Sequence, residues 1–314
     1  MVSKSCAFWI FWLLAGLGFS VSIPQSDAPT AMAGDATYIG FTDTNYNVNI
    51  WAGIRFAKPP LGPLRLQPPQ PYEASGTIPS LEYGNRCFEI GAGAFPDPYN
   101  KTGKNSEDCL VLNIYGPSQS PSGKRWLNAS PSWPVMVYLY GGGFGQGSGN
   151  DYKGQSLVNH SVELGSPVII VTINYRLNFF GFQGKSFTVF NPRELTSLAG
   201  TDAIANNALN LGLHDQRFAL QWVHDNIAAF GGDPNKVTLF GQSAGASSVG
   251  LQMIAYSGAD QNLFRAAILE SGSASDNIIP PLPTWYKYQA AWDYIVAGIG
   301  YAPNLNLETV VEFC

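Results

Sequence analysis

The stretch from Val237 to Gly245 reads Val-Thr-Leu-Phe-Gly-Gln-Ser-Ala-Gly. Its first four residues form an apolar run that predicts a short buried strand, and the small and apolar residues 246–253 after it can begin a helix. Glycines two residues before and two after Ser243 permit the tight strand-to-helix turn that presents a serine nucleophile above a sheet. We therefore predict a nucleophile at Ser243, with the backbone N–H of Ala244 at the helix N-terminus as a donor to a developing oxyanion.

A run of glycines provides a second element of the same kind of site. The apolar segment Val135–Tyr140 predicts a buried strand, and it leads directly into Gly-Gly-Gly-Phe-Gly at 141–145. Glycines let a backbone approach a ligand closely and leave N–H groups free to donate. A flexible surface loop is the alternative, but it does not explain why the run follows a buried strand. We predict Gly142 and Gly143 as two further oxyanion donors.

Several segments in order along the chain resemble the type-B carboxylesterase/lipase family, which includes the cholinesterases and the large fungal lipases. The matching segments are Gly53–Arg65, Ser106–Asn113, Tyr140–Phe144, Asn174–Arg176, Gly212–Arg217, Phe240–Gly245 and Ser271–Ser273. The resemblance implies an α/β-hydrolase fold, with a mostly parallel central sheet and crossover helices. Residues 134 onward agree with this, because predicted strands at 135–140, 167–175, 237–240 and 266–270 alternate with helical segments.

The resemblance also implies a role for individual residues. Ser243 matches the serine that becomes acylated, and Gly142, Gly143 and Ala244 match the three oxyanion donors. Other matches are a buried structural ion pair, Arg65 with Glu107, a supporting residue beside the triad, Ser271, and a disulfide between Cys87 and Cys109. Gln242 differs from the glutamate that precedes the serine in cholinesterases, which argues against a choline ester substrate.

The base that this serine requires is not evident. In α/β-hydrolases the triad runs serine, acid, histidine along the chain, yet all 3 histidines, His160, His214 and His224, precede Ser243. His160 lies in a glycosylation sequon, His214 is expected just before a helix over 215–230 that Asp215 caps, and His224 shares a polar face with Arg217, Gln221 and Asp225. We expect the family's acid and histidine to lie beyond residue 314, so that the chain stops after the strand that follows the nucleophile helix.

The leading interpretation is a carboxylic ester hydrolase that uses an acyl-enzyme and no cofactor, with a small-molecule or lipid ester as substrate. Without the acid and the histidine, this chain is expected to be inactive, and its exposed apolar edge strand to aggregate. Two alternatives stay open: a catalytically dead binding or adhesion protein of the cholinesterase type, and a fragment without function. Acyl-chain length and alcohol group are undetermined.

Composition excludes several other classes. The net charge is −5 and no basic stripe is present, which argues against a nucleic-acid partner. Separated histidines and few cysteines offer no metal-ligand spacing. Residues 1–22 read as a secretory signal peptide, whose apolar run is too short for a stable membrane span, so residues 23–314 form a partial α/β-hydrolase domain that is secreted. Sequons at Asn100, Asn128 and Asn159 are expected in surface loops, and Cys314 is left without a partner.

Overall fold

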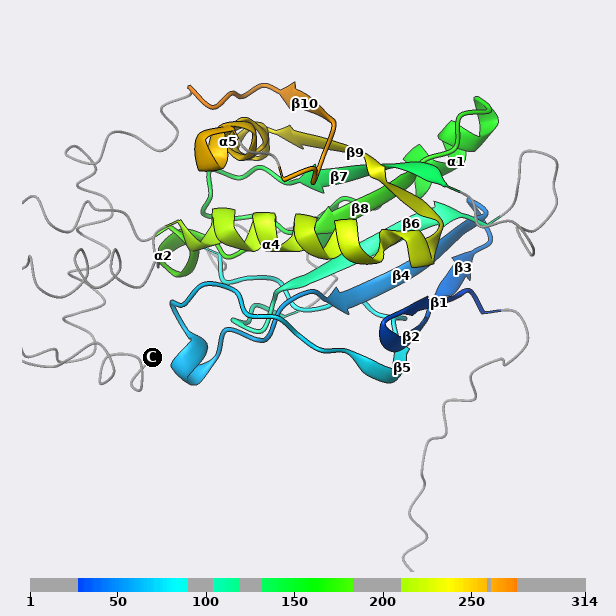
Figure 1. Ribbon diagram of the computed structural model, residues 1–314, viewed down its shortest axis with the longest axis horizontal. Coiled ribbons are helices and arrows are strands. Elements are labelled where there is room, and N and C mark those ends of the chain that lie inside the picture. The colour runs from blue at the N-terminus through cyan, green and yellow to red at the C-terminus, as the bar shows by residue number, and fades with distance from the viewer. Residues whose placement is uncertain (1–27, 90–103, 119–131, 183–209, 259–260, 276–314) are drawn as a thin grey trace, which may run out of the picture.

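A seven-stranded sheet forms the centre of the molecule (Figure 1). The structure is a computed structural model, and it describes residues 28–89, 104–118, 132–182, 210–258 and 261–275. The strands lie in the order β10-β9-β7-β8-β6-β4-β3. Their bounds are β3 Phe41–Asp43, β4 Val48–Arg55, β6 Val111–Pro117, β7 Trp133–Leu139, β8 Ile169–Ile173, β9 Gly232–Gln242 and β10 Ala266–Glu270.

The sheet has a parallel half and an antiparallel half. Strands β8, β7, β9 and β10 pair in parallel, while β6, β4 and β3 continue the sheet with antiparallel pairs. The parallel half begins at residue 133, as predicted, and helices connect its successive strands: α1 (Gln155–Glu163), α4 (Leu211–Asn226) and α5 (Ala244–Gly258). A separate sheet of β1 (Thr30–Ala33), β2 (Asp35–Ile39) and β5 (Ser75–Pro79) lies beside it. The predicted α/β fold class is confirmed.

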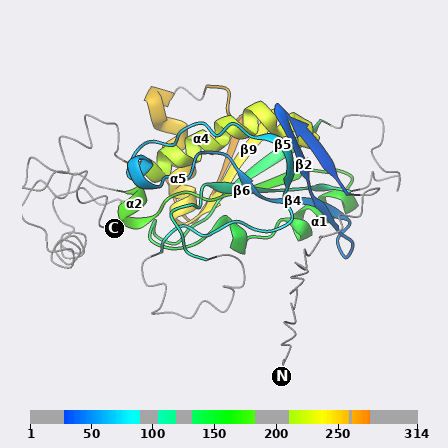
Figure 2. The same cartoon turned by 90° about the horizontal axis from the view of Figure 1, so that it is seen from below.

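Helices cover both faces of the sheet. Figure 2 shows α4 on one side of the strands and α1 on the other. Alternate residues of β8 divide between the two layers, as the two-residue period of a strand requires. Ile170 packs with Val158 of α1, whereas Ile169 and Val171 belong to the larger core that includes Leu220 of α4. Strand β8 is therefore buried on both faces. The four parallel strands have their carboxyl ends at one edge of the sheet.

The helix predicted at 215–230 differs from the observed one at both ends. Helix α4 begins at Leu211 and ends at Asn226, and the next four residues form a separate 3-10 turn, η4 (Ile227–Phe230). Gly212 allows the early start, because a Cβ there would lie 2.5 Å from the carbonyl oxygen of Arg176. Asp215 is therefore inside the helix, where it is fully buried. The prediction that Asp215 caps the helix is wrong, and Arg217, placed on the polar face, is in fact buried.

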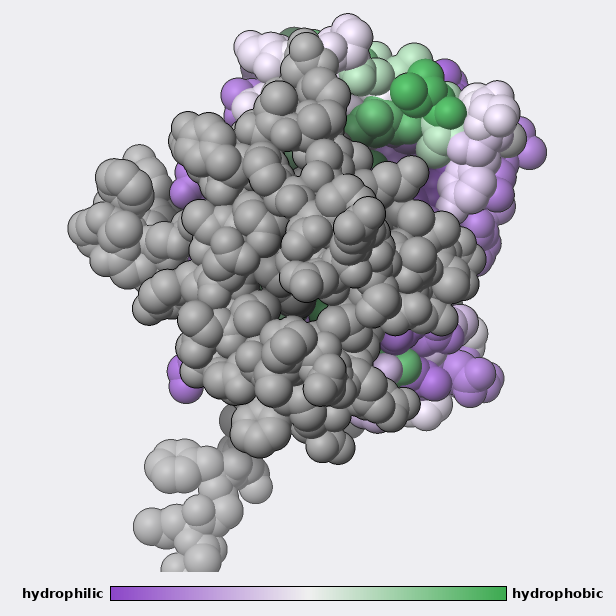
Figure 3. All heavy atoms as spheres, turned by 90° about the vertical axis from the view of Figure 1, so that its left-hand side faces the viewer, coloured by the Kyte–Doolittle hydropathy of each residue, from purple (hydrophilic) through white to green (hydrophobic). Residues whose placement is uncertain are grey.

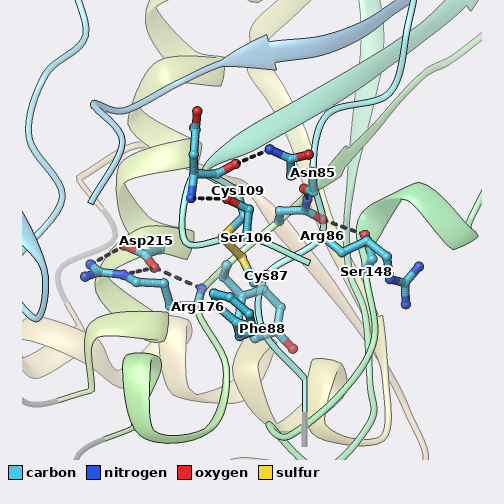
Figure 4. The surroundings of a disulfide bond; sticks show 12 residues. Asn85, Arg86, Cys87, Phe88, Ser106, Cys109, Ser148, Arg176 and Asp215 are labelled. Atoms are coloured by element: carbon cyan, nitrogen blue, oxygen red, sulfur yellow. Dashed lines mark hydrogen bonds and ion pairs between the residues drawn. A yellow bond between two sulfur atoms is a disulfide. The ribbon is translucent and has the colours of Figure 1, made fainter. Parts of the chain in front are cut away.

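The predicted disulfide between Cys87 and Cys109 is confirmed, with a Cα–Cα distance of 5.0 Å. Figure 4 shows it close to the pair formed by Arg176 and Asp215. The disulfide thus joins the segment before residue 90 to the start of β6. Both sulfur-bearing side chains are buried in the larger core.

Apolar surface is exposed where α5 and β10 meet the solvent. Figure 3 shows hydrophobic side chains gathered at the upper end of the molecule, over these two elements. The exposed fractions are 60% for Ile254 on α5 and 43% for Ile268 and 36% for Leu269 on β10. Among the described strands, β10 pairs only with β9, so its other edge has no strand partner there.

Several predicted features fall outside the described residues: the signal peptide at 1–22, the sequons at Asn100 and Asn128, and Cys314. Asn159 is described, and it lies within α1 rather than in a loop, so that part of the prediction is wrong. None of the described helices has the length and hydropathy needed to cross a membrane.

Candidate active site

Ser243 occupies the turn between β9 and α5, at the carboxyl end of the parallel strands. Its φ of 56° is in the left-handed region, which residues with a Cβ rarely adopt. The Ser243 amide donates to the carbonyl of Glu270 on β10 at 2.9 Å, and its own carbonyl accepts from the amide of Ser247 at 3.0 Å. The backbone of the residue is thus fixed on both sides, and the side chain is partly exposed.

The two glycines around the serine are required by close packing. A Cβ at position 245 would lie 1.9 Å from the carbonyl oxygen of Leu139, and one at position 241 would lie 2.5 Å from the carbonyl carbon of Gly245. Real Cβ atoms do not come this close to backbone atoms. The glycines therefore allow α5 to begin directly against the end of β7, which is what makes the turn sharp.

The glycine loop lies beside the serine. A Cβ at Gly141 would be 3.1 Å from the Cβ of Ser243 and 2.5 Å from the carbonyl oxygen of Gln242. The next two glycines have positive φ values, 111° at Gly142 and 62° at Gly143. The structure thus brings together the two segments that the sequence analysis identified separately, although they are about a hundred residues apart in the chain.

Backbone N–H groups are available at this point. Within the described part of the chain, the amides of Gly142, Gly143 and Ala244 donate no hydrogen bond. Ala244 is the first residue of α5, where an amide has no partner inside the helix. Of the three residues, Ala244 is buried, Gly142 is half-buried and Gly143 is exposed. A buried amide without a partner is unusual in proteins, and a ligand oxygen with negative charge would satisfy it.

The turn after β10 also contacts the serine. A Cβ at Gly272 would lie 2.5 Å from the carbonyl oxygen of Ser243. Ser271 has a φ of 57° and is exposed. Its position next to Gly272 agrees with a place beside the site, but no hydrogen bond joins its side chain to Ser243 in the residues that the structure covers.

The histidines are occupied elsewhere. His160 on α1 is 65% exposed and lies 3.3 Å from Glu163, and His224 on α4 lies 3.0 Å from Asp225. His214 lines a surface cavity of about 280 Å³ together with Arg217 and Phe218. In the described ranges, no side chain hydrogen bonds to the hydroxyl of Ser243, and no group of three or more potential ligands could hold a metal ion.

The ion pair implied by the resemblance joins Arg65 Nε to Glu107 Oε2 at 2.7 Å, with both side chains mostly buried. The sequence analysis missed a more deeply buried pair. Asp215 Oδ1 and Oδ2 accept from Arg176 at 2.7 and 2.8 Å, and the Arg176 amide donates to Oδ2 at 3.0 Å. Both partners belong to segments that were matched to the family, so these segments were the available signal, but their contact was not foreseen.

Comparison with known protein families gives one description for most of the chain. A model described as "Carboxylesterase family" matches residues 33–282. The chain is 39% identical over 311 residues to secreted lipase 1 of Botryotinia fuckeliana, covering 92% of this chain and 49% of the lipase. It is 38% identical over 301 residues to lipase 1 of Geotrichum candidum, covering 87% of this chain and 48% of the lipase. The chain thus spans about half the length of these curated relatives.

Comparison with solved structures also gives proteins that match most of this chain. Aspergillus niger EstA is 33% identical, with a TM-score of 0.61 over 77% of this chain and 41% of that protein. The carboxylesterase EST55 of Geobacillus stearothermophilus is 31% identical, with a TM-score of 0.64 over 90% of this chain and 52% of the esterase. The fold described above is the one that these proteins share over the matched part.

Proposed function

Because the chain belongs to the carboxylesterase family, we propose that it carries the nucleophile and the oxyanion-binding groups of a serine ester hydrolase. The observation that carries this proposal is the turn at Ser243, whose left-handed backbone holds a partly exposed serine beside a glycine loop. Amides without a partner at Gly142, Gly143 and Ala244 support the same assignment.

The proposed chemistry is acyl transfer through Ser243. Its Oγ attacks the carbonyl carbon of an ester, and the carbonyl oxygen becomes an oxyanion that the three amides stabilise. The alcohol then leaves and the acyl group stays on Oγ until water releases it as a carboxylic acid. A general base has to accept the serine proton in the first step and activate the water in the second.

We further propose that the 314-residue chain by itself turns over esters poorly. Its 3 histidines all precede Ser243 in the sequence, and two of them pair with carboxylates on α1 and α4. A serine without a base is a weak nucleophile at neutral pH, so the oxyanion groups alone would leave only residual catalysis.

The proposed substrates are carboxylic esters of small alcohols or of lipids, because the relatives named above are lipases and carboxylesterases. We also propose that the protein is secreted. A relative of this chain is named a secreted lipase, and the Cys87–Cys109 disulfide is of the kind that persists in oxidising compartments. The signal-like composition of residues 1–22 supports the same location.

A fluorophosphonate probe tests the nucleophile directly, since it phosphonylates an activated serine. We expect slow, stoichiometric labelling that mass spectrometry maps to Ser243 and that Ser243→Ala abolishes. Ser166→Ala, which removes an exposed serine after α1, is the matched control and should label normally. Absence of labelling at Ser243 in a folded sample would refute the assignment, and rapid hydrolysis of p-nitrophenyl acetate would refute the claim of low turnover.

A further inference from the structure

The glycine loop is held against one short segment, Asn174–Asn178, which follows β8. We propose that this segment is a template that positions the oxyanion amides, and that Asn174 and Tyr175 are positioning residues. The inference rests on the proposed function of the loop. Its physical basis is that the segment contacts the loop at its start, its apex and its end.

At the start of the loop, two tyrosines bind each other reciprocally. The Tyr175 hydroxyl donates to the carbonyl of Tyr140 at 2.7 Å, and the Tyr140 hydroxyl donates to the carbonyl of Tyr175 at 2.9 Å. Their rings are stacked with centroids 4.3 Å apart, and both side chains are fully buried. Since Tyr140 immediately precedes Gly141, this pair fixes the point from which the loop departs.

At the apex, Phe144 fixes the loop to the same segment. Phe144 is 3% exposed and has a φ of 59°, and its ring packs against Phe182 with centroids 4.5 Å apart. Its carbonyl accepts from the amide of Asn178 at 2.7 Å. The side chain of Phe144 thus turns into the core, while the backbone of the preceding Gly143 stays exposed.

At the end of the loop, the side-chain oxygen of Asn174 accepts two hydrogen bonds from the residues that follow the loop. Its Oδ1 accepts from Ser148 Oγ at 3.0 Å and from the amide of Gly149 at 2.9 Å. Its Nδ2 donates to the carbonyl of Asn85 at 2.9 Å, two residues before the disulfide at Cys87. Figure 4 shows two of these partners, Asn85 and Ser148, in the surroundings of the disulfide. Asn174 is 1% exposed, so these contacts are made away from water.

The loop itself has few other constraints. Residues 141–147 form no helix or strand, and the backbone hydrogen bonds within them are turns in which Gly145 and Gln146 donate to the Gly142 carbonyl. The positions of the oxyanion amides therefore depend on the three anchors and on the contact of Gly141 with Gln242 in the nucleophile turn. A displacement of about 1 Å in a reacting arrangement can cost about a hundredfold in rate, so loss of one anchor should affect chemistry more than binding.

The test uses Asn174→Ala and Tyr175→Phe in the full chain, with Tyr115→Phe as the control. Tyr115 is also a fully buried tyrosine, but its hydroxyl donates to Tyr83 and its ring packs in the α1 layer. Hydrogen–deuterium exchange measures the loop without requiring any chemistry. We expect exchange in peptides covering 141–149 to rise by about two- to tenfold in both variants, as the loss of a hydrogen bond would allow, and not in the control.

Fluorophosphonate labelling is the second measurement. We expect the maximal rate of labelling at Ser243 to fall by about ten- to a hundredfold, with the half-saturating probe concentration unchanged. Unchanged exchange in the loop, or exchange that rises equally across the whole chain, would overturn the template. If the loop loosens but wild-type Ser243 never labels, the template stands and the proposed function fails.

Discussion

Ser243 has a backbone conformation that costs a residue with a Cβ about 1 kcal/mol or more. Such strain persists only where the surroundings leave no alternative. Here the amide is bound to Glu270, the carbonyl is bound to Ser247, and Gly245 contacts the end of β7. The serine is therefore held ready rather than free to relax, which is the condition a nucleophile on a turn requires.

Two glycine substitutions should separate the cost of steric overlap from the cost of a left-handed backbone. Gly245→Ala places a Cβ 1.9 Å from the Leu139 carbonyl oxygen, so it should lower the free energy of unfolding by about 3 kcal/mol or more. At Gly143 a Cβ meets nothing within 4 Å, and only the φ of 62° opposes it, so Gly143→Ala should cost about 1 kcal/mol. Urea unfolding of both variants measures the difference, and equal losses would contradict the packing argument.

The nucleophile turn could be predicted from the sequence because its cause is local: two glycines, a serine, and apolar residues on each side. The role of Asp215 could not. Its partner, Arg176, is 39 residues away, so a local pattern showed only an acidic residue near the start of a helix. In the structure Asp215 is buried, and its carboxylate binds the Arg176 guanidinium in the interior instead of capping the amides at the start of a helix.

At the scale of elements, Arg176 and Asp215 join the end of β8 to α4. Both are nearly inaccessible, with side-chain exposures of 3% and 0%. Removing one member of a buried pair leaves the other charge without compensation. Three hydrogen bonds join this pair, and the Arg176 backbone also contacts Gly212 in the first turn of α4. The strands β7–β10 were predictable as apolar runs, whereas this strand-to-helix connection was not.

We expect Asp215→Asn to lower the free energy of unfolding by about 3–5 kcal/mol. Asp225→Asn is the matched control on the same helix, since Asp225 is 53% exposed and should change stability by less than about 0.5 kcal/mol. Chemical denaturation followed by circular dichroism compares the two. A loss in Asp225→Asn as large as that in Asp215→Asn would show that the buried pair is not responsible.

The exposed side of β10 predicts self-association. Ile268 is 43% exposed on β10, which is an edge strand among the described strands, and edge strands pair with other chains unless a charge prevents it. Ile268→Lys should reduce light scattering during heating without lowering the melting temperature. Leu157→Lys is the control, because Leu157 is 52% exposed but lies on helix α1 and not on a strand. It should have no such effect. If Ile268→Lys and the wild type scatter light equally, the exposed edge of β10 is not the cause of self-association.

At the scale of the whole molecule, the part of the chain between β5 and β6, described at residues 80–89 and 104–110, leads into the antiparallel half of the sheet. This part carries the disulfide, and directly before Cys109 it carries two acidic residues that bind arginines: Glu107 with Arg65 and Asp108 with Arg55. The resemblance to a known family predicted the disulfide and the first of these pairs. The antiparallel extension of the sheet was less predictable, because asparagine and glycine interrupt the apolar runs of β4 and β6.

Removal of the disulfide should destabilise the entire fold. Cys87→Ser with Cys109→Ser should lower the free energy of unfolding by about 3 kcal/mol in the loop-entropy model, for a separation of 22 residues. Urea unfolding of the double variant, compared with the wild type before and after treatment with a reductant, measures the effect. Identical midpoints in all three samples would show that the bond contributes nothing to stability.

The stacked tyrosines at the start of the glycine loop also form an optical reporter. Burial raises the pKa of both Tyr140 and Tyr175 well above the ordinary value of 10.0. Their contribution to stability is complete below pH 10 and declines as the pH rises further, because only the unfolded chain then releases these protons. In an alkaline titration their phenolate absorbance should therefore appear late and together with the loss of structure. Burial raises the pKa of Tyr115 as well, so the part of the late absorbance that Tyr175→Phe removes would record the release of the loop, with no substrate and no added dye.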